Sequence, residues 1–282
     1  MKILVIGGTG MLGAPVAQAL QAAGHAVRIL SRDLQKARAR LGETFEYAAG
    51  DVENPASLEA ALNGCQAVHI NLDGGADPDL ERRGVQNTVR AAQKVGVRRV
   101  SYISGATVSV ENTGYAGTKA KFEAEAAIRA SGLEYAIFKP TFFMETLPRF
   151  VRDGRASILG SQPNPLRWVA AADYARMAAK SFEIPNLKKE FYVYGPQAMT
   201  MKEALQAYCD AIHPGLKAGS LPFWLAGVLA MMPGAESLKT AIPFFRYMER
   251  VREGGSPEEA NALLGAPTTT LQTWLQGLKS NA

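Results

Sequence analysis

The chain has 282 residues, enough for one large domain or for a main domain with a smaller one. Hydrophobic residues make up 47% and charged residues 20%, which is typical of a globular protein and excludes a disordered one. The formal net charge is +5, but the basic residues are dispersed. This distribution favours a small anionic ligand and gives no support to nucleic-acid binding.

Cysteine content and hydropathy exclude further classes. Cys65 and Cys209 are too few for a disulfide framework or a metal cluster, so we expect no metal site. The first apolar run leads directly into glycines without a signal-cleavage pattern, and the longest apolar run, residues 221–232, is too short to span a bilayer. We therefore expect a cytoplasmic protein without a transmembrane segment, acting on a small molecule, with its oligomeric state open.

In the first half, short β-branched runs alternate with longer Ala-rich segments of helical spacing. The predicted strands cover residues 3–6, 26–30, 45–48, 67–71, 99–103 and 135–138. The predicted helices between them cover residues 11–23, 55–62, 80–95 and 120–130. Several strands are continuous apolar runs, typical of strands buried on both faces. The fold class predicted is α/β, with a doubly wound parallel Rossmann sheet.

After about residue 140 this alternation ends. Residues 160–165 form a loop by their turn chemistry, and Asp173 is the expected N-cap of a helix over 174–182. Thr200 and Glu203 form a capping box ahead of a helix over 204–212, and the tail from residue 221 is mostly helical, ending in 270–278. We expect a main domain over 1–155 and a smaller, mostly helical substrate-covering domain over 156–282, partly interleaved with the first.

A glycine-rich turn follows the first predicted strand and opens the first helix. Glycine permits the tight turn at Gly7, backbone approach to a pyrophosphate at Gly10 and close helix packing at Gly13. The helix N-terminus would present N–H groups and partial positive charge to phosphates. The alternative is a purely structural turn. We expect the turn to hold a dinucleotide through Gly7, Thr9, Gly10, Met11, Leu12 and Gly13.

The end of the second predicted strand indicates which dinucleotide is bound. An acid there would bind the ribose hydroxyls of NAD, but the chain has Ser31 and Arg32. A guanidinium can bind a 2′-phosphate with two hydrogen bonds, and the serine hydroxyl can add a third. A solvated surface arginine is the alternative. The pattern favours NADP(H) over NAD(H).

These motifs together resemble the NmrA-like branch of the atypical short-chain dehydrogenases/reductases, over roughly residues 1–210. Matches include the turn at 7–13 with Arg32, and the segments 49–52, 70–72, 102–105, 119–123, 131–134 and 139–144. In the last segment Lys139 stands where the family usually has arginine. The resemblance implies that Asp51 and Val52 lie against the adenine, and Asn71 and Leu72 beside the ribose and pyrophosphate. It also implies that Pro140 and Phe142 bind the cofactor.

The same resemblance implies a catalytic pair, Tyr115 and Lys119, which fits the Tyr-x-x-x-Lys pattern of the superfamily. On a helix, residues four apart share a face, and a lysine cation lowers the pKa of a neighbouring phenol so that it can act as a general acid. Lys119 could also bind the nicotinamide ribose, and Ser104 or Thr107 could hold a substrate oxygen. However, Gly114 directly precedes Tyr115, so the tyrosine could instead lie in the loop before the helix.

Three functions follow from these motifs. The first is an NADP(H)-dependent oxidoreductase that reduces a small apolar carbonyl or quinone-like substrate, with Phe142 and Phe143 lining its pocket. The second is a non-catalytic NADP(H)-binding redox sensor or assembly factor, and the third a nucleotide-sugar epimerase. The histidines, His25, His69 and His213, are expected to be structural. The apolar run around Trp224 is interpreted as a buried cap helix, with peripheral membrane contact as the alternative.

Overall fold

The computed structural model describes residues 1–75 and 77–280. The chain divides into two compact units. Unit 1 comprises Met1–Pro140, Ala171–Val193 and Ser256–Ala266, and unit 2 comprises Thr141–Ala170, Tyr194–Gly255 and Pro267–Ala282. The first segment of unit 1 therefore ends before the expected boundary at residue 155. The later segment Ala171–Val193 belongs to unit 1 because its last residues add a strand to the sheet of that unit.

Unit 1 is built on a seven-stranded sheet whose paired strands are all parallel. Neighbouring strands follow the order β10 (Lys188–Val193), β6 (Glu134–Pro140), β5 (Arg99–Ile103), β4 (Ala67–Ile70), β1 (Lys2–Ile6), β2 (Ala26–Ser31) and β3 (Glu46–Ala49). The chain reverses direction across the sheet between β1 and β4. In this fold, a ligand binds at the carboxyl ends of the strands beside such a reversal.

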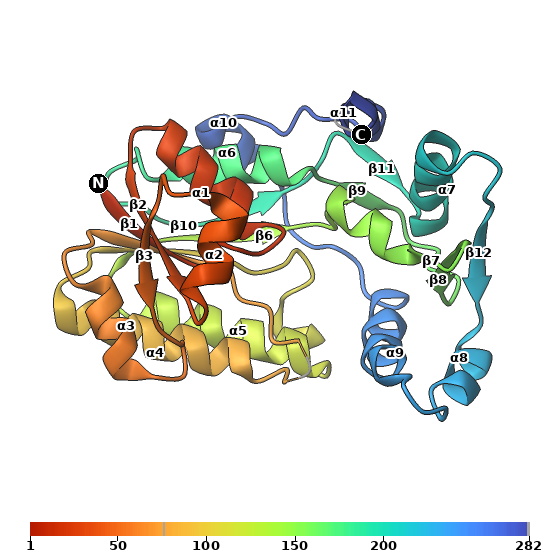
Figure 1. Ribbon diagram of the computed structural model, residues 1–282, viewed down its shortest axis with the longest axis horizontal. Coiled ribbons are helices and arrows are strands. Elements are labelled where there is room, and N and C mark those ends of the chain that lie inside the picture. Colours follow the sequence, from red (N-terminus) through yellow and green to blue (C-terminus); the bar gives the residue numbers. More distant parts are fainter. Residues whose placement is uncertain (76, 281–282) are drawn as a thin grey trace. The chain divides into compact units, whose positions relative to one another are not determined.

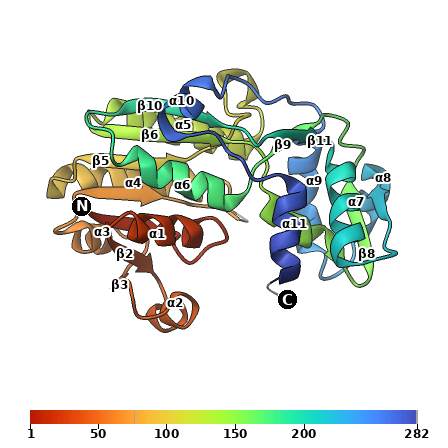
Figure 2. The ribbon, with the colours of Figure 1, turned by 90° about the horizontal axis from the view of Figure 1, so that it is seen from above.

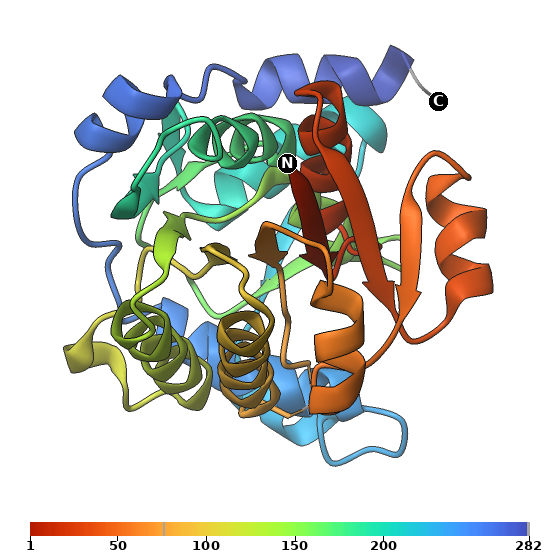
Figure 3. The same ribbon diagram turned by 90° about the vertical axis from the view of Figure 1, so that its left-hand side faces the viewer.

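Helices cover both faces of the sheet, as Figure 3 shows. On one face α3 (Pro55–Leu62), α4 (Leu80–Val95) and α5 (Ala116–Ala130) lie side by side. The other face is covered by α1 (Gly13–Ala22) and α6 (Ala171–Ser181), which pack against each other. The remaining elements of unit 1 are α2 (Leu34–Leu41) beside β3, the short 3-10 helix η1 (Val110–Asn112) and α10 (Glu258–Leu264) beside α6.

Local sequence explains where these helices begin and end. The side chain of Asp33 accepts a hydrogen bond from the Lys36 N–H at the start of α2, and Asn54 caps α3 in the same way ahead of Pro55. Gly96 ends α4 in the left-handed conformation, at φ 80°. Strands β1, β4 and β5 are almost entirely buried, as their continuous apolar runs predict.

The predicted Rossmann sheet is confirmed, with three differences in detail. The strand β10 and the helix α2 were not predicted, because both contain charged side chains that leave no regular spacing of apolar residues. Asp173 is not an N-cap: α6 begins at Ala171, and the buried Asp173 lies in its first turn. The third difference is α5, which begins at Ala116, four residues earlier than expected.

Unit 2 contains two small sheets and mostly helical chain (Figure 1). One sheet joins β7 (Val151–Arg152), β8 (Arg155–Leu159) and β12 (Ala218–Leu221), and the other joins β9 (Leu166–Trp168) and β11 (Gln197–Met199). The helices are η2 (Met144–Phe150), α7 (Met201–Ile212), α8 (Phe223–Leu229), α9 (Glu236–Met248) and α11 (Leu271–Ser280). The predicted Thr200–Glu203 capping box is present, and α11 lies beside α7 (Figure 2).

Candidate functional site

The glycine turn after β1 has no room for side chains at two of its positions. Gly7 has a φ of 73°, and a Cβ built there would lie 1.9 Å from the Asn71 carbonyl oxygen. A Cβ on Gly13 would lie 2.1 Å from the Gly7 carbonyl oxygen and 2.9 Å from Asn71 Nδ2. A Cβ on Gly10 would meet only the Gly7 carbonyl oxygen, at 3.1 Å, a tight contact that a shift of a few tenths of an ångström relieves. That open position is where a dinucleotide pyrophosphate is expected to approach the backbone.

The helix that follows this turn has a free N-terminus for an anion. The N-cap of α1 is Leu12, whose side chain makes no capping hydrogen bond. The Ala14 N–H donates to the Gly10 carbonyl oxygen over 3.1 Å and Pro15 has no N–H, so α1 offers an anion its Gly13 N–H and the positive end of the helix dipole. Thr9, Gly10 and Met11 are partly exposed beside it. These observations fit a bound diphosphate.

At the end of β2, Arg32 is open to solvent. Its side chain is 82% exposed, and Nη1 lies 4.0 Å from Asp51 Oδ2, at the outer limit of an ion pair. The Ser31 hydroxyl donates to the Asp33 carbonyl oxygen over 2.8 Å. Ser31 also receives the Gly50 N–H on its own carbonyl oxygen, which ties the ends of β2 and β3 together. The Arg32 guanidinium is thus positioned beside the β2 and β3 ends and is not committed to a buried partner.

The residues expected at the adenine and ribose also lie at this edge of the sheet. Asn71 follows β4, and its N–H donates to the Ile6 carbonyl oxygen over 3.0 Å, beside the glycine turn. Val52 is buried, and both Val52 and Leu72 pack against Gly84 of α4. The structure therefore brings the Gly7–Gly13 turn, Arg32, Asp51 and Asn71 together at the carboxyl edge of β1 to β4.

Tyr115 and Lys119 are not arranged as the helical spacing predicted. Tyr115 has extended backbone angles at the N-cap of α5, so it lies outside the helix, as its position after Gly114 had suggested. A Cβ on Gly117 would lie 2.8 Å from the Tyr115 ring, which therefore folds over the first turn of α5. The Lys119 side chain is 63% exposed, and its Nζ lies 3.9 Å from Glu123 Oε1. Lys119 lines an open cavity of about 250 Å³ with Arg82.

Ser104 is buried at the end of β5, where its hydroxyl donates to Glu125 Oε1 over 2.5 Å. Glu125 Oε2 lies 3.0 Å from Lys139 Nζ, which is also 2.8 Å from Glu190 Oε2. Burial alone would lower the pKa of Lys139, but the carboxylates of Glu125 and Glu190 outweigh it and raise that pKa. The one proton of Ser104 is therefore used inside the protein in this arrangement.

A second buried cluster was also missed from the sequence. The Tyr102 hydroxyl and Lys121 Nζ both contact Glu81 Oε1, at 2.7 and 2.6 Å. Burial and the Glu81 carboxylate raise the pKa of Tyr102 well above its ordinary value of 10. Both clusters could have been found from acidic residues on the apolar faces of two predicted helices, Glu81 of α4 and Glu125 of α5. An acid on a buried face needs a cationic partner.

Two aromatic residues expected to line the substrate pocket, Phe142 and Phe143, belong to unit 2. Phe142 packs edge-on against Trp168, with ring centroids 5.3 Å apart, and stacks on Phe244 at 6.3 Å. Phe143 is 7% exposed. Pro140 ends β6, and its carbonyl oxygen accepts the Ala106 N–H. The roles of these residues toward cofactor and substrate stay predictions.

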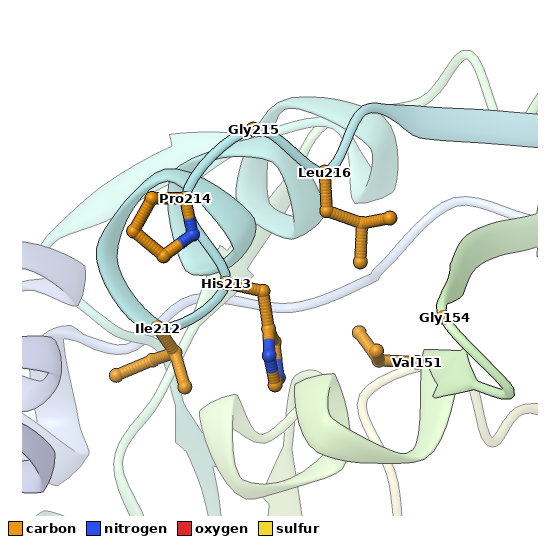
Figure 4. Close-up of a pocket in the computed structure, with 7 residues that line it drawn as sticks. All are labelled: Val151, Gly154, Ile212, His213, Pro214, Gly215 and Leu216. Carbon is orange, nitrogen blue, oxygen red and sulfur yellow. The ribbon is translucent and has the colours of Figure 1, made fainter.

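The histidines fit structural roles. His69 is fully buried, contacts Ser101 Oγ at 3.0 Å and has its pKa lowered by burial to about 3. His25 contacts the N-terminal amine, and burial lowers its pKa. His213 caps α7 and lines a shallow cavity of about 600 Å³ with Val151 and Leu216 (Figure 4). Within residues 1–75 and 77–280, no group of ligating side chains could hold a metal ion.

The fold and this edge of the sheet define a dinucleotide-binding protein of the Rossmann class. Residues 7–183 match the model of the NAD(P)H-binding family, and the chain belongs to that family. This confirms the class indicated by its motifs.

Named relatives cover most of the chain. It is 29% identical to an NAD(P)H azoreductase of Xenophilus azovorans, over 74% of this chain and 73% of that protein. It is 28% identical over 96% of both chains to a (4-alkanoyl-5-oxo-2,5-dihydrofuran-3-yl)methyl phosphate reductase of Streptomyces griseus. A third relative is the photosystem II assembly factor Ycf39 of Synechocystis, 26% identical over 73% of this chain and 66% of that protein.

A solved structure agrees with the fold of the whole chain. The triphenylmethane reductase of Citrobacter, complexed with NADP(H), is 22% identical and covers 98% of this chain and 99% of its own, with a TM-score of 0.78. At this identity the likeness concerns the fold. No helix in the described part of the chain has the length and apolar character needed to cross a membrane.

Proposed function

We propose that the protein is an NADP(H)-dependent oxidoreductase that reduces a small apolar carbonyl or quinone-like substrate. The observation that carries the proposal is the glycine turn at residues 7–13, which leads into a helix N-terminus without a capping side chain, beside the solvent-exposed Arg32 at the end of β2. Relatives named as NAD(P)H azoreductase and as a reductase support reduction as the reaction class.

The chain's own residues would bind and orient the cofactor, which supplies a hydride when bound. The Gly13 N–H and the positive end of the α1 dipole would bind its diphosphate, beside Gly10, which has no side chain to obstruct it. Arg32 would bind the 2′-phosphate with two hydrogen bonds and thereby select NADP(H) over NAD(H). Tyr115 is the proposed proton donor to the substrate oxygen, and Lys119 the proposed cation beside phenol and cofactor.

A second candidate function is a non-catalytic NADP(H)-binding regulator or assembly factor. Two observations favour it. The hydroxyl of Ser104 is occupied by Glu125, and the Lys119 side chain is mostly exposed beside Glu123. The likeness to the photosystem II assembly factor Ycf39 supplies a relative of that class.

NADPH oxidation separates the two functions. The purified protein is mixed with NADPH and with quinones, azo dyes, aldehydes and ketones in turn, and absorbance of the reduced nicotinamide is followed. Calorimetry on the same sample measures NADPH affinity. The oxidoreductase is expected to oxidise NADPH with at least one substrate class. Tight NADPH binding without oxidation by any of them would favour the regulator.

A further inference from the structure

Exposed apolar side chains gather on one segment of unit 2. Of the large hydrophobic residues that are exposed in the described chain, most fall within residues 224–232: Trp224, Val228, Leu229, Met231 and Met232. Trp224 is 71% exposed and Met231 76%. The interpretation of this segment as a buried cap helix is therefore wrong. A concentration of this kind marks an interaction site, whereas single exposed apolar residues do not.

The patch follows the outward face of α8 and the chain after it. Trp224 and Val228 are four residues apart and share the exposed face of α8, Met231 is exposed in the turn just after the helix, and Ala226 and Ala230 are buried. Within unit 2, α8 packs against α9, and the segment joining them lies at the end of the unit opposite α11 (Figure 1). The face turned to solvent is thus the more apolar face, which inverts the usual arrangement of a surface helix.

The scarcity of hydrogen-bonding side chains in this segment favours a lipid surface over a protein as its binding partner. Between residues 221 and 235, the Trp224 indole is the one side chain able to donate or accept a conventional hydrogen bond. Protein partners usually supply about one hydrogen bond per 100–200 Å² of interface, which these side chains cannot match. The acyl region of a lipid layer forms no hydrogen bonds and can therefore accept these apolar side chains. Trp and Met beside short apolar helices are suited to that boundary.

The charges around the patch favour an anionic lipid surface. Residues 211–235 contain no acid, and their one formal charge is that of Lys217. The first acid beyond them, Glu236, is paired with Lys239 at 2.8 Å. On α9 the Arg246 guanidinium lies 5.0 Å from the ring centroid of Phe223, the neighbour of Trp224 in the chain. A cation beside an apolar patch is attracted to anionic headgroups.

We propose that this segment, the α8 face, binds the surface of an anionic phospholipid bilayer, with Trp224, Val228 and Met231 inserted to the level of the acyl boundary and Arg246 at the headgroups. The protein would then be peripheral and reversibly bound. This inference is independent of the proposed oxidoreductase function.

Vesicle binding tests the proposal. The full-length protein is sedimented with vesicles of phosphatidylglycerol and phosphatidylcholine in equal parts, and with vesicles of phosphatidylcholine alone, at low and high salt. We expect binding to the mixed vesicles that weakens in high salt, because surface charges are screened. Met231→Glu is expected to weaken binding by about tenfold to a hundredfold, since it loses the burial of one large apolar side chain.

Two controls make the result specific. Val110→Glu changes an exposed valine of η1 in unit 1 and is expected to bind like the unaltered protein. Lipids brominated along the acyl chain should quench tryptophan fluorescence, and Trp224→Phe should abolish that quenching, although Trp168 and Trp274 remain. Thermal melts confirm that each variant is folded.

The proposal is overturned if the mixed vesicles do not bind the protein, or if Met231→Glu binds as well as Val110→Glu. A concentration-dependent dimer in light scattering, abolished by Met231→Glu and accompanied by no vesicle binding, would identify a second copy of the chain as the occupant instead.

Discussion

The hydroxyl of Ser104 donates a hydrogen bond to the Glu125 carboxylate over 2.5 Å, joining the end of β5 to the middle of α5. Glu125 is 1% exposed and also contacts Lys139, which is itself buried. A residue expected to bind substrate thus belongs to a charged network in the interior of unit 1. Removing Glu125 would leave the buried Ser104 hydroxyl without this acceptor and Lys139 with Glu190 alone, in a region with little water.

The first prediction concerns this network. Glu125→Ala is expected to lower the free energy of unfolding by about 1–3 kcal/mol, because it leaves the buried Ser104 hydroxyl without its acceptor and the Lys139 ammonium with Glu190 alone. Urea denaturation measures the change. Glu123→Ala is the matched control: Glu123 lies two residues away on α5, its side chain is 40% exposed, and its loss is expected to cost within about 0.5 kcal/mol. Similar losses in both variants would contradict this role of Glu125.

The second prediction concerns cofactor choice. Arg32→Ala is expected to weaken NADPH binding by about 1.5–3 kcal/mol, the range for a hydrogen bond to a charged group, and to leave NADH binding nearly unchanged. Calorimetry with both dinucleotides measures the difference. Arg40→Ala, at the exposed far end of α2, should change neither affinity. Equal losses for NADPH and NADH in Arg32→Ala would rule out a 2′-phosphate contact.

The third prediction separates two glycines of the same turn. Gly10→Val is expected to leave the fold intact and to abolish dinucleotide binding, because its side chain occupies the space of the pyrophosphate. Gly13→Ala is expected to lower the melting temperature as well, because its Cβ would lie 2.1 Å from the Gly7 carbonyl oxygen. Thermal melts and calorimetry on both variants test this. Normal binding by folded Gly10→Val would mean that the phosphates bind elsewhere.

The fourth prediction concerns the proposed acid. Tyr115→Phe keeps the ring and removes the proton, so it should spare NADPH affinity and lower turnover by about 10²–10⁴-fold, the usual contribution of general acid catalysis. Lys119→Met should lower both affinity and turnover, because the ammonium is proposed to serve cofactor and phenol together. Steady-state rates and calorimetry measure the two effects. Unchanged turnover in Tyr115→Phe would exclude the tyrosine as the essential acid.

The fifth prediction is a dependence of stability on pH. Burial lowers the pKa of His69 from 6.5 to about 3, so the folded state disfavours the protonated ring. The folded state therefore keeps its full stability with respect to His69 above pH 6.5 and loses stability as the pH falls toward 3, because His69 of the unfolded chain takes up its proton at a higher pH than His69 of the folded chain. Each bound proton corresponds to about 1.36 kcal/mol per pH unit in this window. His69→Asn should reduce the slope of unfolding free energy against pH by about that amount, as urea denaturation at several pH values between about 4 and 6 measures, and an unchanged slope would contradict this role of His69.

The order of elements in unit 1 was predictable because its signals are local. Continuous apolar strands, helical spacing and the glycines after β1 each arise from neighbouring residues, and they placed Arg32 and Asn71 at the edge where the structure finds them. The seventh strand was not predictable, since β10 begins with Lys188, Lys189 and Glu190 and joins the sheet by pairing with β6.

The orientations of side chains in the site depended on tertiary structure. A shift of one residue in the start of α5 decides whether Tyr115 lies inside the helix or before it, and sequence spacing does not locate a helix start to within one residue. The buried Glu125 is paired with Lys139 of β6, and Lys139 in turn with Glu190 of β10, a strand distant in sequence that was not predicted.

The sequence by itself determined the Rossmann order, the glycine cradle and the arginine at the end of β2, because each depends on backbone conformation within a few residues. Only the tertiary structure decided that the Ser104 proton is held by Glu125 and that the apolar run at Trp224 faces solvent. Hydrogen-bond partners and exposure depend on which distant segments pack together, and apolar composition alone does not distinguish a buried face from an exposed one.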